Sequence, residues 1–218
     1  MRKSALIAAA ATLALASVLT VHAQEKISDG VVKIGMIEDM SSLYADITGI
    51  GAVTAARMAA EDFGGKVLGK PIEIISADHQ NKADLASSIA REWFDTQHVD
   101  ALMDVAASAT ALAAIEVAKN KNKIVVLNGP AAVRITNEAC TPVSVHYAYD
   151  NYALSHGTAA AMVKEGYDSW FFITADYAFG HDLEQNTAAV VKASGGKVLG
   201  SVRVPINTSD FSSALLQA

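Results

Sequence analysis

The sequence predicts an α/β fold made of two lobes, each with a parallel sheet, and three observations support this prediction. Short β-branched apolar segments alternate with segments whose apolar residues recur at helical spacing. Such alternation is typical of a parallel sheet with helices on both faces. The alternation restarts after residues 128–142. The hexapeptide GGKVLG also occurs twice, from Gly64 and from Gly195, which indicates two lobes of similar construction, although a common helix-stop pattern is an alternative explanation.

The first lobe is predicted to contain four parallel strands separated by helices. The run VVKIGMI at residues 31–37 is β-branched and apolar, as a buried strand requires. In the helix that follows, apolar residues recur at helical spacing from Ile50 to Phe63, and two glycines stop it as a helix C-cap does. The other predicted elements are strands over 71–78, 101–105 and 123–128, and helices around 85–94 and over 108–121.

The second lobe repeats the same order of elements. The apolar run SWFFIT and the run KVLGSVRVP are predicted strands, each preceded by a helix. Ser209-Asp210 is positioned to cap a last helix that begins at Phe211. The predicted elements are helices over 151–165 and 178–193 and strands over 169–174 and 197–205.

The first residues have the composition of a signal peptide. Arg2 and Lys3 precede an apolar run rich in alanine, and Ala23 offers a small residue for cleavage before Gln24. An uncleaved membrane anchor is the alternative, but the run is short for a membrane span. We therefore expect an exported protein. Its predicted parts are a signal peptide over 1–23, a first α/β lobe over 24–147 and a second, partial α/β lobe over 148–218.

Composition narrows the function classes. Hydrophobic residues make up 51% of the chain, which is enough for a sizeable core. The formal net charge is −6 and the basic residues are scattered, so no nucleic-acid partner is expected. No base can be assigned to Cys140, the single cysteine, and we interpret it as a buried free thiol rather than a nucleophile. The histidines lack metal-ligand spacing, so no metal site is predicted.

Two local patterns resemble enzyme motifs, and neither has the required context. The G-x-G at residues 49–51 opens a helix and Asp78 ends the next strand, as in a dinucleotide site, but a long loop separates these glycines from the first strand. Ser194 and Lys197 have S-x-x-K spacing, but they lie in a predicted turn and no K-T-G follows. We therefore predict no catalytic residues, no cofactor and no enzymatic activity.

The loops after two strands occupy equivalent positions in the two lobes. One follows the strand at 31–37, and the other, ADYAFG, follows the strand at 169–174. In open α/β sheets, ligands bind at the carboxyl ends of the strands. Two lobes placed face to face would bring both loops to one cleft. Asp176 and Tyr177 are therefore expected to meet a ligand between the lobes.

The chain resembles a known family over nearly all of the residues after the signal peptide. The matching pieces are VKIGMIEDMSSLYADITGIG, AASATALA, VVLNGPAA, YAYDNYALSHGTAAAMV and WFFITADYAFGHDLE leading to TSDFSSALLQA. Together they resemble solute-binding proteins of ABC importers, in the branched-chain amino acid (Leu/Ile/Val) type of type I periplasmic binding proteins. The resemblance implies two Rossmann-like lobes. Such proteins are usually much longer, so the second lobe is expected to be incomplete.

The resemblance also implies where a ligand binds. Ser108, Ala109 and Thr110 follow a strand and open a helix, where the family binds the ligand carboxylate; ordinary helix capping is the alternative. In similar proteins the next loop contacts the ligand head group, and an aromatic ring covers the ligand at the position of Tyr177. The further predicted ligand residues are Asn128, Gly129, Ala131, Tyr149 and Asp150.

Three further residues near the predicted cleft have open interpretations. Tyr44 and Thr48 lie in the first-lobe loop and are candidate gate residues, or simply part of a solvated loop. Asp176 either caps the helix that follows it or contacts the ligand.

The resemblance implies a periplasmic protein that captures a small organic solute by closing two lobes about a hinge. The expected ligand is an amino acid or an aromatic or short-chain carboxylate. The expected partner is the membrane permease of an ABC transporter, and the protein itself is expected to be a monomer. A ligand-sensing module of a receptor on the same fold is the alternative.

Overall fold

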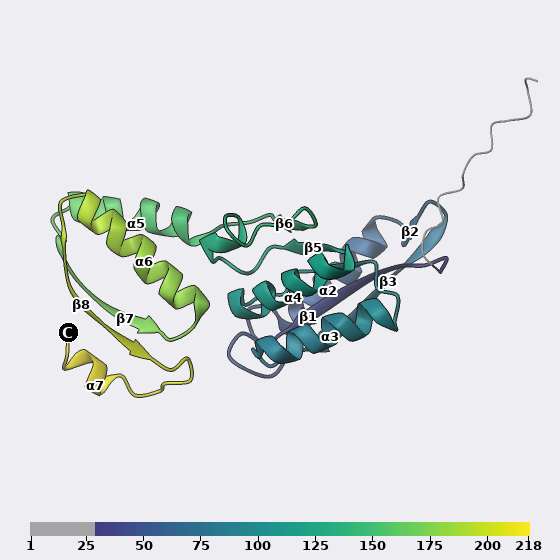
Figure 1. Cartoon of the computed structure of the whole chain (residues 1–218), viewed down its shortest axis with the longest axis horizontal. Helices are drawn as coiled ribbons and strands as arrows, with labels where there is room; N and C mark the ends of the chain where they lie inside the picture. Colours follow the sequence, from purple (N-terminus) through teal and green to yellow (C-terminus); the bar gives the residue numbers. More distant parts are fainter. Residues whose placement is uncertain (1–28) are drawn as a thin grey trace, which may run out of the picture.

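The computed structural model describes residues 29–218, so the predicted signal peptide lies outside the described residues. Figure 1 shows an elongated molecule, with the helices and strands up to β6 on one side and α5, α6, α7, β7 and β8 on the other. The strands form two sheets, one of six strands and one of two. This arrangement confirms the predicted α/β fold and the separation of the strands into two groups. The exact lobe boundaries stay a prediction.

The first sheet has the strand order β2-β3-β1-β4-β5-β6. All its pairs are parallel except β2–β3. Glu38 at the end of β1 is opposite Asp78 at the end of β3, so the carboxyl ends of neighbouring strands lie at one edge. The strands are β1 (Val32–Glu38), β2 (Lys66–Val67), β3 (Lys70–Asp78), β4 (Ala101–Met103), β5 (Ile124–Leu127) and β6 (Ser144–His146).

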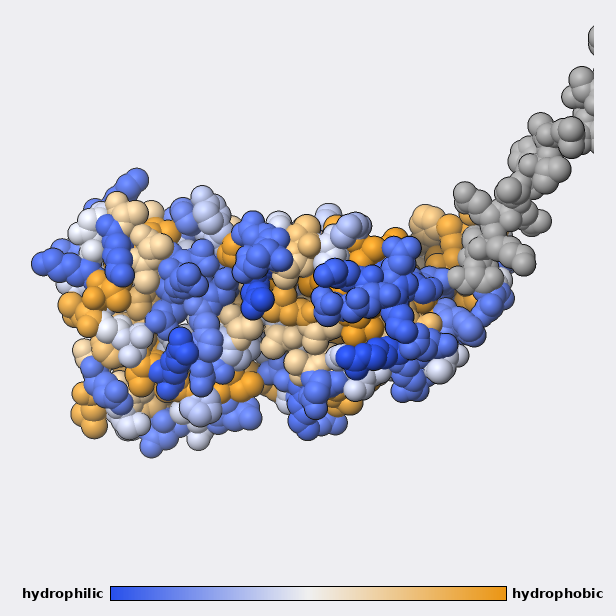
Figure 2. Space-filling model, in the orientation of Figure 1, coloured by the Kyte–Doolittle hydropathy of each residue, from blue (hydrophilic) through white to orange (hydrophobic). Residues whose placement is uncertain are grey.

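The core of the first lobe lies between this sheet and its helices. Leu102 on β4 and Trp93 on α3 are buried in it. Gly35 on β1 makes room for the indole, because a Cβ there would lie 2.5 Å from the Trp93 ring. On the face viewed in Figure 2, hydrophilic residues cover much of both lobes, with apolar patches between them. The helical segments of this lobe are α2 (Gly49–Asp62), α3 (Ala83–Asp95), α4 (Ser108–Lys121) and the 3-10 turn η1 (Val133–Ile135).

The second sheet pairs β7 with β8 in parallel. Its helices α5 and α6 pack on each other through a small buried cluster of Ala159, Val190 and Val191. No helix among residues 29–218 is long and apolar enough to cross a membrane. The elements are α5 (Asn151–Lys164), β7 (Ser169–Ala175), α6 (Ala178–Ala193), β8 (Lys197–Val204) and α7 (Ser212–Leu215).

The repeated hexapeptide GGKVLG has different structures in its two copies. Both copies follow a helix, and Gly64 and Gly195 both have positive φ, +98° and +90°. In the first copy, Leu68 and Gly69 also have positive φ and turn the chain, so that β2 pairs antiparallel with β3. In the second copy the chain continues straight into β8. The repeat therefore marks the same place in the element order without specifying the same backbone.

Several sequence-based expectations need correction. The strand predicted over 101–105 ends at Met103, because Asp104 and Val105 have φ of +74° and +52° and leave the extended conformation. The short strands β2 and β6 were not predicted. Cys140 is an exposed free thiol rather than a buried one, because it lies in the loop between η1 and β6.

Candidate ligand-binding cleft

A hollow of about 440 Å³ opens at the carboxyl ends of β4 and β5 and is lined from both lobes. Its position agrees with the general rule for ligand sites in open α/β sheets. Six of its lining residues are predicted ligand residues. They are Ser108, Asn128, Gly129, Ala131, Tyr149 and Tyr177; the others are Tyr44, Ile47, Thr48, Asp104, Ala106, Ala107, Pro130 and Phe179.

The loop after β1 presents Tyr44 and Thr48 to this cleft, and Asp39 holds the loop in place. The Asp39 carboxylate accepts hydrogen bonds from the backbone N–H groups of Ser42 (2.8 Å) and Tyr44 (2.9 Å) and from the Ser42 hydroxyl. Burial would raise the pKa of Asp39, but these hydrogen bonds outweigh it and lower the pKa. Asp39 is therefore ionised and serves as the anchor of the loop.

Ser108 connects the two turns that form the floor of the cleft. It is the first residue of α4, and its buried hydroxyl oxygen accepts from the backbone N–H groups of Ala131 and Ala132, both at 3.2 Å. The capping alternative is wrong for Ser108, because Ala107 occupies the N-cap position and no side chain caps the helix. The first N–H groups of α4 thus lack a side-chain acceptor and carry the partial positive charge of a helix N-terminus.

Three predicted ligand residues do not line the cleft. The hydroxyl of buried Thr110 donates to the Ala107 carbonyl at 2.8 Å and lies 3.4 Å from His79 Nε2, so it is used inside the lobe. Ala109, on the same turn of α4, is also absent from the lining. Asp150 is the N-cap of α5, and its carboxylate accepts from the Ala153 N–H at 2.8 Å.

Tyr44 and Tyr177 join the two lobes across the cleft. Their hydroxyl groups are hydrogen-bonded to each other, and their ring centroids lie 6.4 Å apart. Burial raises the pKa of Tyr177, and the bond with Tyr44 raises it further. Burial also raises the pKa of Tyr44, although its bond with Tyr177 opposes this. Both phenols are therefore neutral and able to donate or accept a hydrogen bond.

The aromatic wall extends on both sides of this pair. Phe179 lies 5.9 Å from Tyr177, measured between ring centroids. Tyr149, at the crossing between the lobes, has its hydroxyl 3.4 Å from the Gly129 carbonyl. The cleft therefore combines polar backbone groups on its floor, which belongs to the first lobe, with aromatic rings that present apolar surface to a ligand.

Asp176 has neither of the two roles considered for it. Tyr177, not Asp176, is the N-cap of α6. The Asp176 carboxylate instead contacts His181 Nε2 at 2.7 Å on the surface and is not part of the cleft lining. The segment ADYAFG ends in Gly180 because a larger residue does not fit there: a Cβ would lie 2.1 Å from the Ala175 carbonyl oxygen. Only glycine allows α6 to begin this close to β7.

A second link between the lobes lies beside the cleft. Asp182 on α6 accepts hydrogen bonds from the backbone N–H of Val133 (3.0 Å) and from the side chain of buried Asn151 (2.7 Å). The Asn151 N–H also donates to the Ala131 carbonyl at 2.7 Å. These bonds connect α6 with the first-lobe loop that contributes Ala131 to the cleft.

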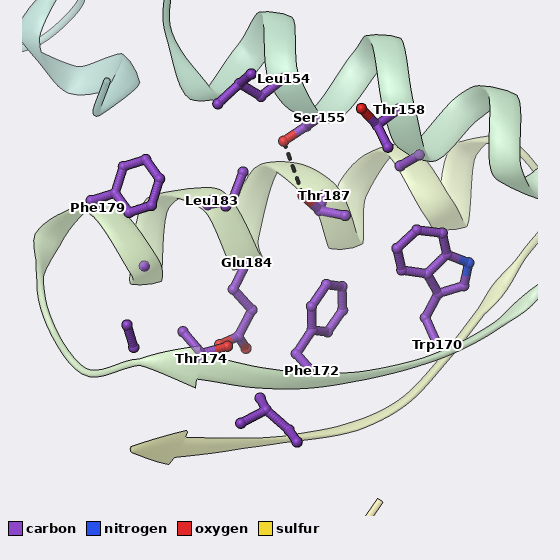
Figure 3. A pocket seen from close by; sticks show the side chains of 14 residues that line it. Leu154, Ser155, Thr158, Trp170, Phe172, Thr174, Phe179, Leu183, Glu184 and Thr187 are labelled. Atoms are coloured by element: carbon purple, nitrogen blue, oxygen red, sulfur yellow. Dashed lines mark hydrogen bonds between the residues drawn. The ribbon is translucent and has the colours of Figure 1, made fainter. Parts of the chain in front are cut away.

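A larger hollow of about 500 Å³ lies inside the second lobe, between α5, α6 and β7. Figure 3 shows Trp170, Phe172 and Leu183 facing into it, with the Ser155–Thr187 hydrogen bond on its helical side. Its walls are mostly apolar and come from one lobe alone. We therefore assign the ligand site to the smaller hollow between the lobes.

Asp104 is the one charged residue among the cleft residues that the sequence-based prediction missed; the others are Ile47, Ala106, Ala107, Pro130 and Phe179. Asp104 follows β4 and is 5% exposed, and it lines the cleft beside Gly129. The available signal was an acid directly after a short apolar strand, in ALMDV. The left-handed backbone at Asp104, which turns it out of the strand, had no signal in the sequence.

The comparisons with known proteins concern the family and the fold. The family model for periplasmic binding proteins matches residues 31–218. A crystal structure of a periplasmic binding protein from Burkholderia mallei is 60% identical, with a TM-score of 0.84 over 87% of this chain and 50% of that one. A branched chain amino acid ABC transporter periplasmic ligand-binding protein from Burkholderia xenovorans LB400 is 43% identical, with a TM-score of 0.72 over 86% of this chain and 50% of that one.

More distant relatives carry named ligands. A solute binding protein of an ABC transporter from Rhodopseudomonas palustris BisB5, in complex with 3,4-dihydroxy benzoic acid, is 25% identical, with a TM-score of 0.78 over 87% of this chain and 51% of that one. The Leu/Ile/Val-binding protein homolog 6 of Brucella abortus is 27% identical over 185 residues, 84% of this chain and 46% of that protein. The chain thus spans about half the length of these relatives.

Proposed function

The chain belongs to the periplasmic binding protein family, and from this premise we propose that it is the solute-binding component of an ABC importer. It captures a small organic solute between its two lobes in the periplasm and delivers it to the membrane permease. It acts as a monomer and performs no chemistry on the solute. The proposed parts are a signal peptide over 1–23 and lobes over 24–147 and 148–218.

One observation carries this proposal: the cleft is lined from both lobes, and Tyr44 and Tyr177 connect the lobes across it. A ligand that contacts both lobes stabilises their closed arrangement, because it binds that arrangement more tightly than an open one. This is the property that a capture-and-release protein needs.

The lining supports a carboxylate ligand with an apolar body. The uncapped N–H groups at the start of α4 suit a carboxylate, and the rings of Tyr44, Tyr177 and Phe179 suit an apolar or aromatic part. Two relatives point the same way, since one is named for Leu, Ile and Val and another holds a dihydroxybenzoate. We therefore propose an amino acid or an aromatic carboxylate as the solute.

A thermal-shift screen of the intact protein tests the function. The panel contains leucine, isoleucine, valine, benzoate and 3,4-dihydroxybenzoate, with glucose as a control that has no carboxylate. A cognate ligand at a hundred times its Kd should stabilise the protein by about 2.7 kcal/mol and raise its Tm, whereas glucose should not. If no carboxylate in the panel raises the Tm, the proposed ligand class is wrong.

A further inference from the structure

Two buried acids lie side by side under the cleft. Glu38 ends β1 and Asp104 follows β4, which is the neighbouring strand, with Met36 opposite Met103 in the register. Glu38 is fully buried and Asp104 is 5% exposed. Within residues 29–218, no hydrogen bond of normal geometry reaches either carboxyl oxygen of Glu38 or Oδ1 of Asp104. Buried polar atoms rarely lack a partner, so this pair needs an explanation.

The pair holds a proton at neutral pH. Burial and the neighbouring Asp104 raise the pKa of Glu38 to about 9, although the backbone N–H groups of Val105 and Ala106 partly oppose this. Burial also raises the pKa of Asp104, against the effect of the Gly129 N–H. The raised pKa of Glu38 therefore keeps the proton of the pair on Glu38 at neutral pH.

The other titratable groups at this edge of the first sheet do not neutralise the pair of Glu38 and Asp104. Asp39 and Asp78 have lowered pKa values because hydrogen bonds from their surrounding loop outweigh burial. Burial lowers the pKa of His79, so it is neutral. The tyrosines facing the cleft, Tyr44, Tyr149 and Tyr177, supply no positive charge, and no lysine or arginine is among the described residues that line it.

The backbone holds Asp104 against the cleft at some cost. Its φ is +74° and that of Val105 is +52°, a left-handed conformation that is unfavourable for side chains other than glycine. The opposite turn also requires glycine, because a Cβ at Gly129 would lie 3.0 Å from Asp104 Oδ1 and 2.8 Å from Ala106 Cα. Strain of this kind concentrates at functional sites.

We propose that Asp104 is a ligand-contacting residue that accepts a hydrogen bond from a donor group of the solute. This inference rests on the proposed function and narrows its ligand class. The solute carries a carboxylate, for the start of α4, and also an amino or hydroxyl group, for Asp104. Both features face the same cleft, and Asp104 is the one acidic side chain among the described residues that line it, so a donor group of the solute would find its charged acceptor there.

Calorimetric titration of the intact protein with two matched pairs of ligands tests this inference. Leucine is compared with 4-methylpentanoate, which is leucine without its amine, and 3,4-dihydroxybenzoate with benzoate. Wild-type protein should bind the donor-bearing member of at least one pair about tenfold or more tightly than its partner. A larger preference in the leucine pair indicates that the donor is an amino group, and a larger preference in the benzoate pair indicates a hydroxyl group.

The variant Asp104→Asn should reduce that preference by about tenfold, because a charged acceptor binds a donor more strongly than an amide does. Asparagine tolerates the left-handed backbone, so the fold should survive. Asp78→Asn is the matched control at the same edge, because Asp78 holds the loop through Met40, Ser41 and Gln80 outside the cleft. The amide oxygen of asparagine can keep the two backbone bonds, and its NH2 group can donate to the Ser41 hydroxyl in place of the bond that the carboxylate accepts. This control should keep the wild-type preference.

The pH dependence gives a second readout. As pH falls through the raised pKa of Asp104, its carboxylate takes a proton and becomes a neutral, weaker acceptor for the ligand's donor group. The wild-type preference should therefore fall on acidification, and Asp104→Asn should remove this dependence. If Asp104→Asn keeps both the preference and its pH dependence, the inference is wrong while the proposed function stands. If wild-type protein binds none of the four probes and no carboxylate of the thermal-shift panel raises its Tm, the proposed ligand class fails together with this inference.

Discussion

The two lobes use the same order of strands and helices but differ in how completely they are packed. In the first lobe, six strands and their helices enclose a continuous core around Leu102. In the second, a two-stranded sheet supports only a small buried cluster, and a hollow of about 500 Å³ remains between α5, α6 and β7. Among the described residues, the six-stranded sheet therefore buries more apolar surface than the two-stranded sheet does.

The difference between the lobes bears on the cleft. The first lobe supplies its rigid floor, where Ser108 connects two turns through buried hydrogen bonds. The second lobe supplies Tyr177 and Phe179 from the start of α6, and it is attached to the first through Asp182 and Asn151. A ligand in the cleft therefore contacts elements of both lobes, as a site that opens and closes requires.

The largest expected effect is on the stability of the first lobe. Leu102→Ala removes a fully buried side chain and should lower the free energy of unfolding by about 2–5 kcal/mol. Phe172→Ala removes a larger side chain, but one that lines an existing hollow, so it should cost less than the Leu102 variant. Urea denaturation of both variants measures the contrast. An equal or greater loss for Phe172→Ala would contradict the difference in packing.

The next effect concerns the buried acid of the first lobe. Glu38 keeps its proton to about pH 9 in the folded protein and releases it near 4.5 when unfolded. Between these values the folded state binds more protons, so this group's contribution to stability is lost as pH rises from about 4.5 to about 9. Glu38→Gln avoids the loss and should stabilise the protein at pH 7 by up to about 3 kcal/mol.

Urea denaturation over a series of pH values checks this prediction. The gain from Glu38→Gln should shrink toward zero as pH approaches the unfolded-state pKa of 4.5. Glu73→Gln on β3 is the control, because that side chain is half exposed and should change stability little. A Glu38→Gln variant with no gain at pH 7 would mean that Glu38 is not held protonated.

A smaller effect is expected at the link between the lobes. Asp182→Ala leaves the Val133 N–H without its acceptor and leaves the Asn151 amide only its bond to the Phe179 carbonyl, which should cost about 1–3 kcal/mol. Hydrogen exchange should become faster at Val133 and in the first turn of α5. Asp176→Ala removes only a surface contact with His181 and should cost less than about 1 kcal/mol. Unchanged exchange at Val133 in Asp182→Ala would mean that this link does not hold the lobes together.

The sequence alone was sufficient to predict the bounds of helices and strands whose apolar residues have a strong periodicity. The helices α4 and α6 have the predicted bounds, and β1, β3, β7 and β8 lie within a residue or so of them. The apolar pattern decides these elements locally. The strands β2 and β6 are too short to show a period, and they exist because neighbouring strands offer them hydrogen bonds.

The site was predictable only in part, for the same reason. Ser108, Asn128 and Tyr177 follow strand ends, and this position alone brings them to the cleft. Thr110 is two residues further along α4, where its hydroxyl donates to the Ala107 carbonyl instead of facing the cleft. Asp104 and Glu38 come together only through the pairing of β1 with β4, which no local pattern encodes.

Calorimetric titration of Tyr177→Ala tests most directly whether the cleft between the lobes binds the solute. Removing a ring that lines the cleft and bridges to Tyr44 should weaken binding of the cognate solute by about 1–3 kcal/mol. Tyr177→Phe keeps the ring and should lose less. If Tyr177→Ala binds the solute as tightly as wild-type protein, the ring does not contact it and the cleft assigned here is not the binding site.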